Sequence, residues 1–247
     1  MEKPTCPLNP ELLEAKQVLG KGDIVVKSQL GEGSNTAFLV QLCTGSDSCV
    51  EAIYKPRDGE RFLQDFPEGS LYKREYASYL ISRILGWPNI PITTIRDGPY
   101  GLGSMQLFVD HDPSITYFDL INDRRDELHK IAVFDALVNN ADRKAGHCLL
   151  GRDNVIWSID HGLTMHASFK VRTVMLELWG QPYPKKVIGD LELLSKTLEN
   201  KNCLSSKLSK ILDDTEIISL EHRLSILLKY EALPSLDPYK HVPWPIL

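Results

Sequence analysis

The sequence predicts an α+β fold in two parts: an antiparallel sheet with one long helix over residues 1–109, and a helical part over residues 110–247. Short extended runs separated by turn residues come first, and an amphipathic helical period follows them. Helical periods dominate the chain from about residue 123 onward. With 247 residues, of which 43% are hydrophobic, the chain is long enough to bury a substantial core.

The first part begins with a short helix after Asn9-Pro10, because proline suits the first position of a helix. Three strands are then expected at Asp23 to Leu30, Ala37 to Cys43 and Val50 to Tyr54. The turn-rich sequences GEGSNT and TGSDS join them, which predicts an antiparallel meander. Lys55 is expected to close the third strand.

A long helix is expected from Ser70 to Gly86, where apolar residues recur at helical spacing and glycine marks the end. Glu75 lies within this helix. Two further strands are expected on either side of Asp97-Gly98, which completes a sheet of about five strands. A short linker near Phe108 to Pro113 then leads into the second part.

The second part is expected to contain four longer helices, with two short strands and polar loops after the first. The helices are expected at Asp123 to Val138, Val187 to Leu198, Leu204 to Leu212 and Thr215 to Leu233. The tail after Pro234 is rich in proline and is expected to be extended, either docked or loose.

The net charge and the cysteine content limit the classes of function that fit this sequence. The net charge of −5 gives no basic field for nucleic acid. No apolar run is long enough to insert in a membrane, and residues 1–16 lack an apolar signal core, so a cytoplasmic protein is expected. The five cysteines are scattered and form no Cys-x-x-Cys pair, so reduced thiols are expected, with no disulfide framework and no zinc site.

The loop GEGSNT is a candidate phosphate-binding loop. Gly31 and Gly33 would let backbone N–H groups approach phosphate oxygens closely, and Ser34 would add a hydroxyl. An ordinary hairpin turn explains the same residues, because an isolated Gly-x-Gly is a weak signal. No Gly-Lys-Ser/Thr follows, so this is not a Walker loop.

Lys55 and Glu75 form the second candidate pair. A lysine next to apolar strand residues can act as a point charge for phosphate, and a glutamate on the following helix would hold its head group in place. A solvated strand-end lysine and a glutamate on a solvated helical face are the alternatives.

The stretch 139–162, NNADRKAGHCLLGRDNVIWSIDHG, carries the strongest signal. Asp142 follows an apolar helix and two asparagines, where a carboxylate can orient a hydroxyl and accept its proton. Asp160 ends a short strand before His161-Gly162, a setting typical of a ligand for a divalent metal. Either aspartate alone fits a cap or a turn. Two of them around a strand–turn–strand favour a functional site.

Asn140-Ala141-Asp142-Arg143 and Ile159-Asp160-His161-Gly162 resemble the catalytic and metal loops of the phosphatidylinositol 3-/4-kinase-like family, a branch of the protein-kinase-like fold. The chain is similar, over roughly Gly22 to Tyr230, to a small bacterial family placed in that branch. The resemblance implies a protein-kinase-like two-lobed fold with ATP and Mg²⁺ as cofactors. The pair of loops is fairly specific, whereas the glycine loop is not.

The resemblance also implies roles for single residues. In the catalytic loop, Asp142 would be the base that orients the acceptor hydroxyl, with Arg143 beside it. Asp160 would bind magnesium between the phosphates. Lys55 would contact the α- and β-phosphates and be held by Glu75.

The nucleotide base would lie at the end of the sheet. A hinge near Gln106 to Val109 would bring the backbone of Leu107, Phe108 and Val109 to hydrogen-bond the adenine. Gly31, Gly33 and Ser34 would cover the phosphates.

His147 departs from the family pattern. These kinases usually carry an asparagine, which helps to hold metal, five positions after the catalytic aspartate. If His147 is a ligand, its imidazole favours Mn²⁺ or another transition metal over Mg²⁺. If it is instead a hydrogen-bonding loop histidine, Asp160 alone holds one metal ion. His161, within the Asp-x-Gly, is expected to replace an aromatic packing residue.

The leading hypothesis is an ATP-dependent phosphotransferase that acts on a hydroxyl of a protein or of a small polar metabolite. A membrane phosphoinositide is disfavoured as the acceptor, because the acidic chain offers no polybasic patch. Two alternatives stay open: transfer of AMP on the same fold, and a nucleotide-binding pseudokinase that acts as a scaffold or regulator.

Overall fold

The structure, a computed structural model, describes residues 10–31, 35–45, 48–200 and 203–247. Five strands form one antiparallel sheet in the order β1-β2-β3-β5-β4. A separate two-stranded sheet pairs β6 with β7. The bounds are β1 Asp23–Leu30, β2 Ala37–Thr44, β3 Ser48–Pro56, β4 Thr93–Gly98, β5 Gly101–Leu107, β6 Cys148–Leu150 and β7 Ile156–Ser158.

β3 lies in the middle of the large sheet and continues to Pro56, so Lys55 lies inside the strand instead of closing it. Lys55 is paired with Ser104 of β5. A Cβ atom added to Gly103 would lie 2.3 Å from the carbonyl oxygen of Lys55, so only glycine fits beside this strand. The backbone that carries Lys55 is therefore fixed by strands on both sides.

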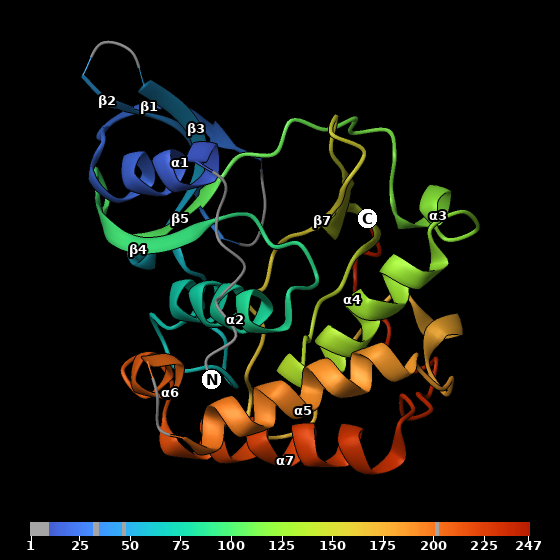
Figure 1. The fold of residues 1–247 in the computed structure, drawn as a ribbon. Coiled ribbons are helices and arrows are strands. Elements are labelled where there is room, and N and C mark those ends of the chain that lie inside the picture. Colours follow the sequence, from blue (N-terminus) through green and yellow to red (C-terminus); the bar gives the residue numbers. More distant parts are fainter. Residues whose placement is uncertain (1–9, 32–34, 46–47, 201–202) are drawn as a thin grey trace.

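Two helices pack on the large sheet. α1, Pro10–Lys21, contacts β2, β3, β4 and β5. α2, Leu71–Leu85, contacts β4 and β5 and also α5, so it joins the sheet to the helical part of the molecule (Figure 1). Gly86 ends α2 with a φ of 77°, a left-handed conformation that glycine adopts without strain.

The helical part contains α3 Tyr117–Leu120, α4 Arg125–Val138, α5 Lys185–Glu199, α6 Cys203–Leu208 and α7 Asp214–Tyr230. In Figure 1 the two long helices α5 and α7 lie side by side at the end opposite the large sheet, and they are in contact. The longer helices lie close to the predicted ranges. α7 ends earlier than predicted, because Glu231 turns left-handed three residues before Pro234.

The proline-rich tail is docked. The backbone N–H of Thr173 donates to the carbonyl of His241, and that of Ala145 donates to the carbonyl of Ile246. The tail therefore returns to the loop between α4 and β6, and Figure 1 shows the C-terminus beside β7.

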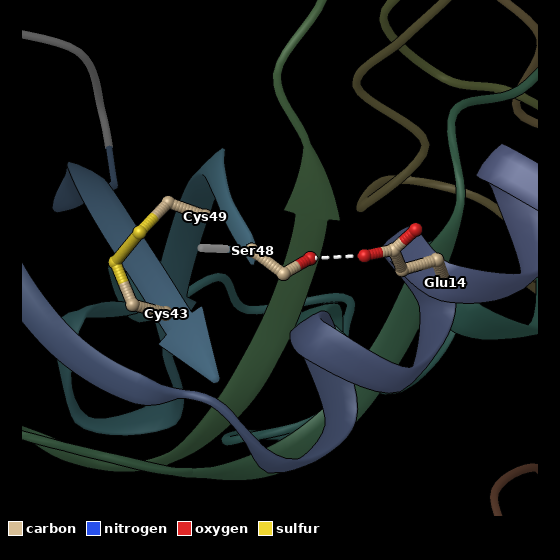
Figure 2. The surroundings of a disulfide bond; sticks show 4 residues. All are labelled: Glu14, Cys43, Ser48 and Cys49. Carbon is tan, nitrogen blue, oxygen red and sulfur yellow. Dashed lines mark hydrogen bonds between the residues drawn. A yellow bond between two sulfur atoms is a disulfide. The ribbon is translucent and has the colours of Figure 1, made fainter. Parts of the chain in front are cut away.

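One cysteine prediction is wrong. Cys43 of β2 and Cys49 of β3 form a disulfide, as shown in Figure 2. The two residues are directly opposite each other across the β2–β3 hairpin, with Cα atoms 4.1 Å apart. Cross-strand partners lie at the separation that a disulfide needs. Counting Cys-x-x-Cys motifs misses this geometry, because the pairing depends on the register of the hairpin. Cys148 is a buried free thiol, as expected.

The α+β architecture with an antiparallel sheet and a helical part is confirmed. The division at residues 109 and 110 stays a prediction. None of the helices in the described residues combines the length and apolar character needed to cross a bilayer.

Candidate active site

The structure brings Lys55, Glu75 and Asp160 into direct contact. The Lys55 ammonium forms an ion pair with Oε1 of Glu75 and another with Oδ1 of Asp160, the latter at 2.9 Å. Oε2 of Glu75 accepts a hydrogen bond of 3.0 Å from the backbone N–H of His161. Glu75 therefore fixes both the lysine head group and the backbone next to Asp160. We call these three residues the front cluster.

Asp160 and Lys55 of the front cluster hold their charges strongly, whereas burial raises the pKa of Glu75. The Lys55 ammonium keeps the pKa of the Asp160 carboxyl well below its usual range. Burial works against the charged form of Lys55, but the carboxylates of Asp160 and Glu75 outweigh it and raise its pKa. Asp160 has a φ of 58°, an uncommon conformation for a residue other than glycine, and its side chain is 46% exposed. The ionised carboxylate is thus paired with Lys55 and still partly open to solvent.

Asp142 lies on the loop after α4. Asn139 ends α4 in a left-handed conformation, and the side-chain oxygen of Asn140 accepts a hydrogen bond of 3.0 Å from the N–H of Asp142. Burial raises the pKa of Asp142 to about 6, although the Lys144 ammonium, 3.6 Å from its carboxylate, acts in the opposite direction. A pKa close to neutrality suits a group that must accept a proton.

Arg143 does not have the position that a catalytic role requires. Its guanidinium is completely buried and forms two parallel contacts with the Asp135 carboxylate, at 2.7 and 2.8 Å. The other donors reach the carbonyls of His147 and Ile159 and the Nε2 atom of His161. The expected catalytic role of Arg143 is therefore revised. Arg143 connects α4 to the loop that carries His147 and to the loop that carries Asp160. We call Arg143 and Asp135 the rear pair.

Asp135 was not foreseen as part of the site. It lies in α4 within the apolar sequence AVFDALV and is completely buried. It also accepts a hydrogen bond of 2.9 Å from the side chain of Asn140. An acidic residue inside an apolar helical run needs a buried partner, so this signal was present in the sequence.

His147 makes contact with Asp160. Its Nδ1 atom accepts a hydrogen bond of 3.3 Å from the N–H of Lys144, so the proton of the neutral ring lies on Nε2. Nε2 lies 3.3 Å from Oδ2 of Asp160. Burial lowers the pKa of His147 to about 4, so the ring is neutral at pH 7. This arrangement supports the expectation of a hydrogen-bonding loop histidine, because the nitrogen that faces the site carries a proton.

His161 packs as expected for an aromatic substitute. Its ring is completely buried and lies edge-on to Phe134, with ring centroids 5.7 Å apart. Its Nε2 atom also contacts Arg143 and the hydroxyl of Ser158, at 3.0 and 3.1 Å. Burial keeps its pKa well below the usual range, so His161 supplies packing and a hydrogen bond without charge.

Most hydrogen-bond donors of the predicted adenine-binding residues already bond to other parts of the protein. The side chain of Gln106 is buried and donates to Thr93, and the N–H groups of Leu107 and Phe108 donate to the carbonyls of Ile92 and Glu51. In the described part of the chain, the N–H of Val109 has no hydrogen-bond partner. Val109 is therefore the donor of this segment that remains available to a base.

The glycine loop is described only in part. Gly31 has a φ of 46°, which favours glycine. Gly33 and Ser34 lie outside the described residues, so their predicted contact with phosphate stays a prediction.

A second buried ion pair sets the position of α2. Arg74, which precedes Glu75, is 1% exposed; it forms an ion pair with Glu216 of α7 and donates to the carbonyl of Thr164 at 2.6 Å. Any movement of α2 that separated Glu75 from Lys55 would also have to disturb this pair.

The segment after Gly162 is held against the loop that carries Asp142. The N–H of Ala141 donates to the carbonyl of Leu163 at 2.8 Å, and the N–H of Arg143 donates to the carbonyl of Arg172 at 3.0 Å. The N–H of Val174 returns a bond to the carbonyl of Arg143 at 3.1 Å. Asp142 and Asp160 are thereby held in one continuous framework.

The described residues contain no group of three or more histidine, cysteine or acidic side chains arranged to hold a metal ion. The donor set nevertheless fits a divalent cation bound together with a nucleotide. Asp160 offers an ionised, partly exposed carboxylate, whereas the two oxygens of Glu75 are already bonded to Lys55 and to the N–H of His161. Carboxylate oxygens are the ligands of Mg²⁺, which is usually bound by one or two carboxylates plus phosphates.

The chain has sequence relatives in Mycobacterium tuberculosis and in Arabidopsis thaliana. No protein-family model matches the chain. Protein Rv2133c of Mycobacterium tuberculosis is 34% identical over 263 aligned positions, covering 92% of this chain and 94% of the relative. Phosphatidylinositol 4-kinase gamma 4 of Arabidopsis thaliana is 27% identical and covers 68% of this chain. The matched region is 36% of that kinase's own length.

Solved structures share the fold. The Golgi casein kinase with Mn/ADP bound has a TM-score of 0.57 over 89% of this chain and 75% of its own, at 15% identity. The Helicobacter pylori proinflammatory kinase CtkA has a TM-score of 0.52 over 87% of this chain and 94% of its own, at 12% identity. The predicted protein-kinase-like fold is confirmed. The chain therefore belongs to one family with the mycobacterial protein, and this family is kinase-like, with phosphatidylinositol 4-kinases among its relatives.

Proposed function

We propose that the protein is an ATP-dependent phosphotransferase that moves the γ-phosphate of ATP to a hydroxyl group. The contact of Lys55 with both Glu75 and Asp160 is the single observation that carries this proposal. Phosphoryl transfer needs positioned phosphates, neutralised charge and an oriented hydroxyl, and little other chemistry from the protein. Lys55 would position the phosphates, Asp160 would hold the cation that neutralises their charge, and Asp142 would orient the hydroxyl.

Lys55 would bind the α- and β-phosphates as a point charge. Glu75 holds its ammonium on one side, so the lysine is positioned before the nucleotide arrives. The base would bind at the end of the sheet, where the N–H of Val109 is available. Gly31 and the loop that follows it would cover the phosphates.

Asp160 would hold a divalent metal ion, Mg²⁺ or Mn²⁺, which would supply positive charge against the phosphates. Its low pKa keeps it ionised, and its exposed side chain is accessible. The Golgi casein kinase structure, which has the same fold, has Mn/ADP bound. His147 would donate a hydrogen bond to Asp160 and so fix the direction of the carboxylate.

Asp142 would orient the acceptor hydroxyl and accept its proton. Its pKa of about 6 leaves it largely ionised at pH 7 and still basic enough to take a proton. Arg143 and Asp135 would act as positioning residues, because they hold the two loops and do not face the site.

Two measurements on the purified chain test the proposal. ATP with Mn²⁺ or Mg²⁺ should raise the melting temperature, since a ligand that binds the native state stabilises it. Intact-mass analysis of an acceptor, or of the autophosphorylated chain, should show the addition of one phosphate. A product carrying AMP would indicate nucleotidyl transfer instead. A melting shift without turnover would indicate a pseudokinase, and the absence of any shift with nucleotide would overturn the proposal.

A further inference from the structure

A cavity of about 520 Å³ lies between the segment that follows β3 and the first turn of α2. Its volume is within the range of small-molecule binding sites. Residues with apolar, aromatic and charged side chains line it, among them Arg57, Glu60, Arg61, Phe66, Tyr72 and Lys73. None of these residues belongs to the front cluster or to the predicted adenine site.

The cavity lies next to the catalytic loop. Two of its lining residues, Phe66 and Leu71, form a small apolar cluster with Ala141, the residue before Asp142. Leu71 also lies beside Gly162, the last residue of the Asp-x-Gly motif. The wall of the cavity is therefore in contact with both loops of the candidate active site.

The opposite edge of the cavity is tied to the start of β2. The N–H of Thr36 donates to the carbonyl of Gly59 at 2.9 Å, and the N–H of Arg61 donates to the side-chain oxygen of Asn35 at 2.7 Å. β2 follows the glycine loop predicted to cover the phosphates. The cavity thus borders the edge of the site where the γ-phosphate would lie, between the start of β2 and the catalytic loop.

Two of the three carboxylates that line the cavity already have partners. Glu60 accepts hydrogen bonds from the N–H groups of Leu71 and Tyr72, at 3.0 and 2.8 Å, and so satisfies the first turn of α2. Asp58 pairs with Arg57 at 3.0 Å. Arg57 and Asp58 neutralise each other, whereas Glu60 keeps its charge and uses its oxygens on backbone N–H groups of α2.

The remaining charged groups are Arg61, Lys73 and Glu68. Within the described residues, neither Arg61 nor Lys73 forms an ion pair, although the Lys73 ammonium lies 6.0 Å from the centre of the Tyr72 ring. Among the described residues, the cavity lining therefore offers two cations and one carboxylate, Glu68, that form no ion pair. Cations bind a phosphate group, and a carboxylate accepts hydrogen bonds from hydroxyl groups.

We propose that this cavity is the acceptor site, and that the acceptor is a small phosphate ester with a free hydroxyl group. Arg61 and Lys73 would hold its phosphate, and Glu68 would accept a hydrogen bond from a hydroxyl. The cavity is too small for a folded protein segment, and two cations are too few to recognise a membrane surface. This inference rests on the proposed phosphotransferase activity and adds the class of its substrate.

The reaction follows from this placement. The hydroxyl oxygen of the ester forms a bond to the γ-phosphorus, and the bond from that phosphorus to the bridging oxygen of ADP breaks. The hydroxyl proton goes to the Asp142 carboxylate and then to solvent. The products are ADP and an ester that carries a second phosphate.

Binding of inorganic phosphate tests the site directly. The affinity should be measured by NMR titration with a non-hydrolysable ATP analogue and diamagnetic Mg²⁺ present, so that the γ-phosphate position is filled. We expect the Arg61→Ala/Lys73→Ala double variant to bind phosphate about 10-fold more weakly than the wild type, since both are charge-assisted contacts. Lys186→Ala, an exposed lysine of α5, is the matched control and should bind as the wild type does.

Equal affinity in the wild type and the double variant would overturn the proposal, as would the absence of phosphate binding to the wild type. Transfer to glycerol 3-phosphate but not to glycerol would support it, and equal transfer to both would count against it. The melting shift produced by ATP in the wild type is measured separately. If that shift is absent, the proposed activity fails, while the difference in phosphate affinity between the two proteins still decides the assignment of the cavity.

Discussion

The front cluster and the rear pair both contact the loop 140–147 but are built differently. In the rear pair, Arg143 and Asp135 are both completely buried, and the guanidinium is surrounded by acceptors. In the front cluster, Asp160 is 46% exposed and Lys55 is 26% exposed. Lys55 there faces two carboxylates, so negative charge is in excess.

The difference in burial indicates that the rear pair positions the loops and that the front cluster takes part in the chemistry. A buried ion pair whose donors and acceptors are all used cannot respond to a ligand, and removing one partner leaves a buried charge without compensation. An exposed cluster with excess negative charge can take up a cation and exchange partners. The rear pair is therefore expected to control stability, and the front cluster to control activity.

Asp135→Asn should have the largest effect on stability. It removes the charge that balances the buried Arg143 guanidinium, and we expect a loss of about 3–5 kcal/mol in the free energy of unfolding. Urea denaturation measures this loss. Asp123→Asn, at an exposed position, is the control and should change stability by less than about 0.5 kcal/mol. A loss below about 1 kcal/mol for Asp135→Asn would show that the pair is not a structural tether.

Arg74→Met should cause the second-largest loss of stability. It breaks the ion pair with Glu216 and leaves a carboxylate that is 8% exposed and can regain part of its hydration. We expect a loss of about 3 kcal/mol, somewhat less than for Asp135→Asn. Because Glu75 lies on the same helix, ATP turnover should fall too. Unchanged stability combined with unchanged turnover would contradict the inference that α7 holds α2 in position.

Asp142→Asn should stabilise the protein at neutral pH. Burial raises the pKa of Asp142 in the folded state from 3.8 to about 6, so ionisation is less favourable there than in the unfolded chain. Below about pH 4 the group is protonated in both states and has no effect; stability is lost as pH rises towards about 6.

The variant should therefore match the wild type near about pH 3.5 and exceed its stability by about 2 kcal/mol at pH 8, a value reduced for partial solvent exposure. Thermal unfolding at both pH values measures the difference. Equal stabilities at pH 8 would show that Asp142 is not held in an unfavourable environment. In the wild type, turnover should rise with pH through about 6, because the protonated carboxyl cannot accept a proton.

His147→Ala should have the smallest effect. In the structure its Nε2 proton faces Asp160, so the loss should affect the direction of the carboxylate and not the number of metal ligands. Turnover should fall less than about 10-fold with Mg²⁺ and with Mn²⁺, and the ratio of the two rates should stay the same. A selective loss of the Mn²⁺-dependent rate would show instead that His147 is a metal ligand.

The sequence was sufficient to predict the parts of the molecule that depend on local patterns. The strands and the long helices followed from periodicity, whereas the pairing of Lys55 with Glu75 was one of two open interpretations that the kinase-like resemblance favoured. Asp160 was predicted as a site residue because it follows a short strand and precedes a glycine. The strand and helix patterns repeat along the chain, and the setting of Asp160 is visible from its neighbours in sequence.

Features that depend on three-dimensional pairing could not be predicted in the same way. Arg143 was expected in the catalytic machinery, because its burial and its pairing with Asp135 are not visible from its neighbours. The disulfide Cys43–Cys49 depends on hairpin register. Leu107 and Phe108 were expected to bind adenine, but the sheet already uses their N–H groups.

The central claim is that the front cluster performs the chemistry, and Asp160→Asn tests it most directly. Its rate of Mn²⁺-dependent ATP turnover should be compared with that of the wild type, together with the melting temperature of both proteins. For Asp160→Asn we expect a fall of about 100-fold or more in turnover, with a melting temperature within about 4 °C of the wild type. Turnover within a few-fold of the wild-type rate would contradict it.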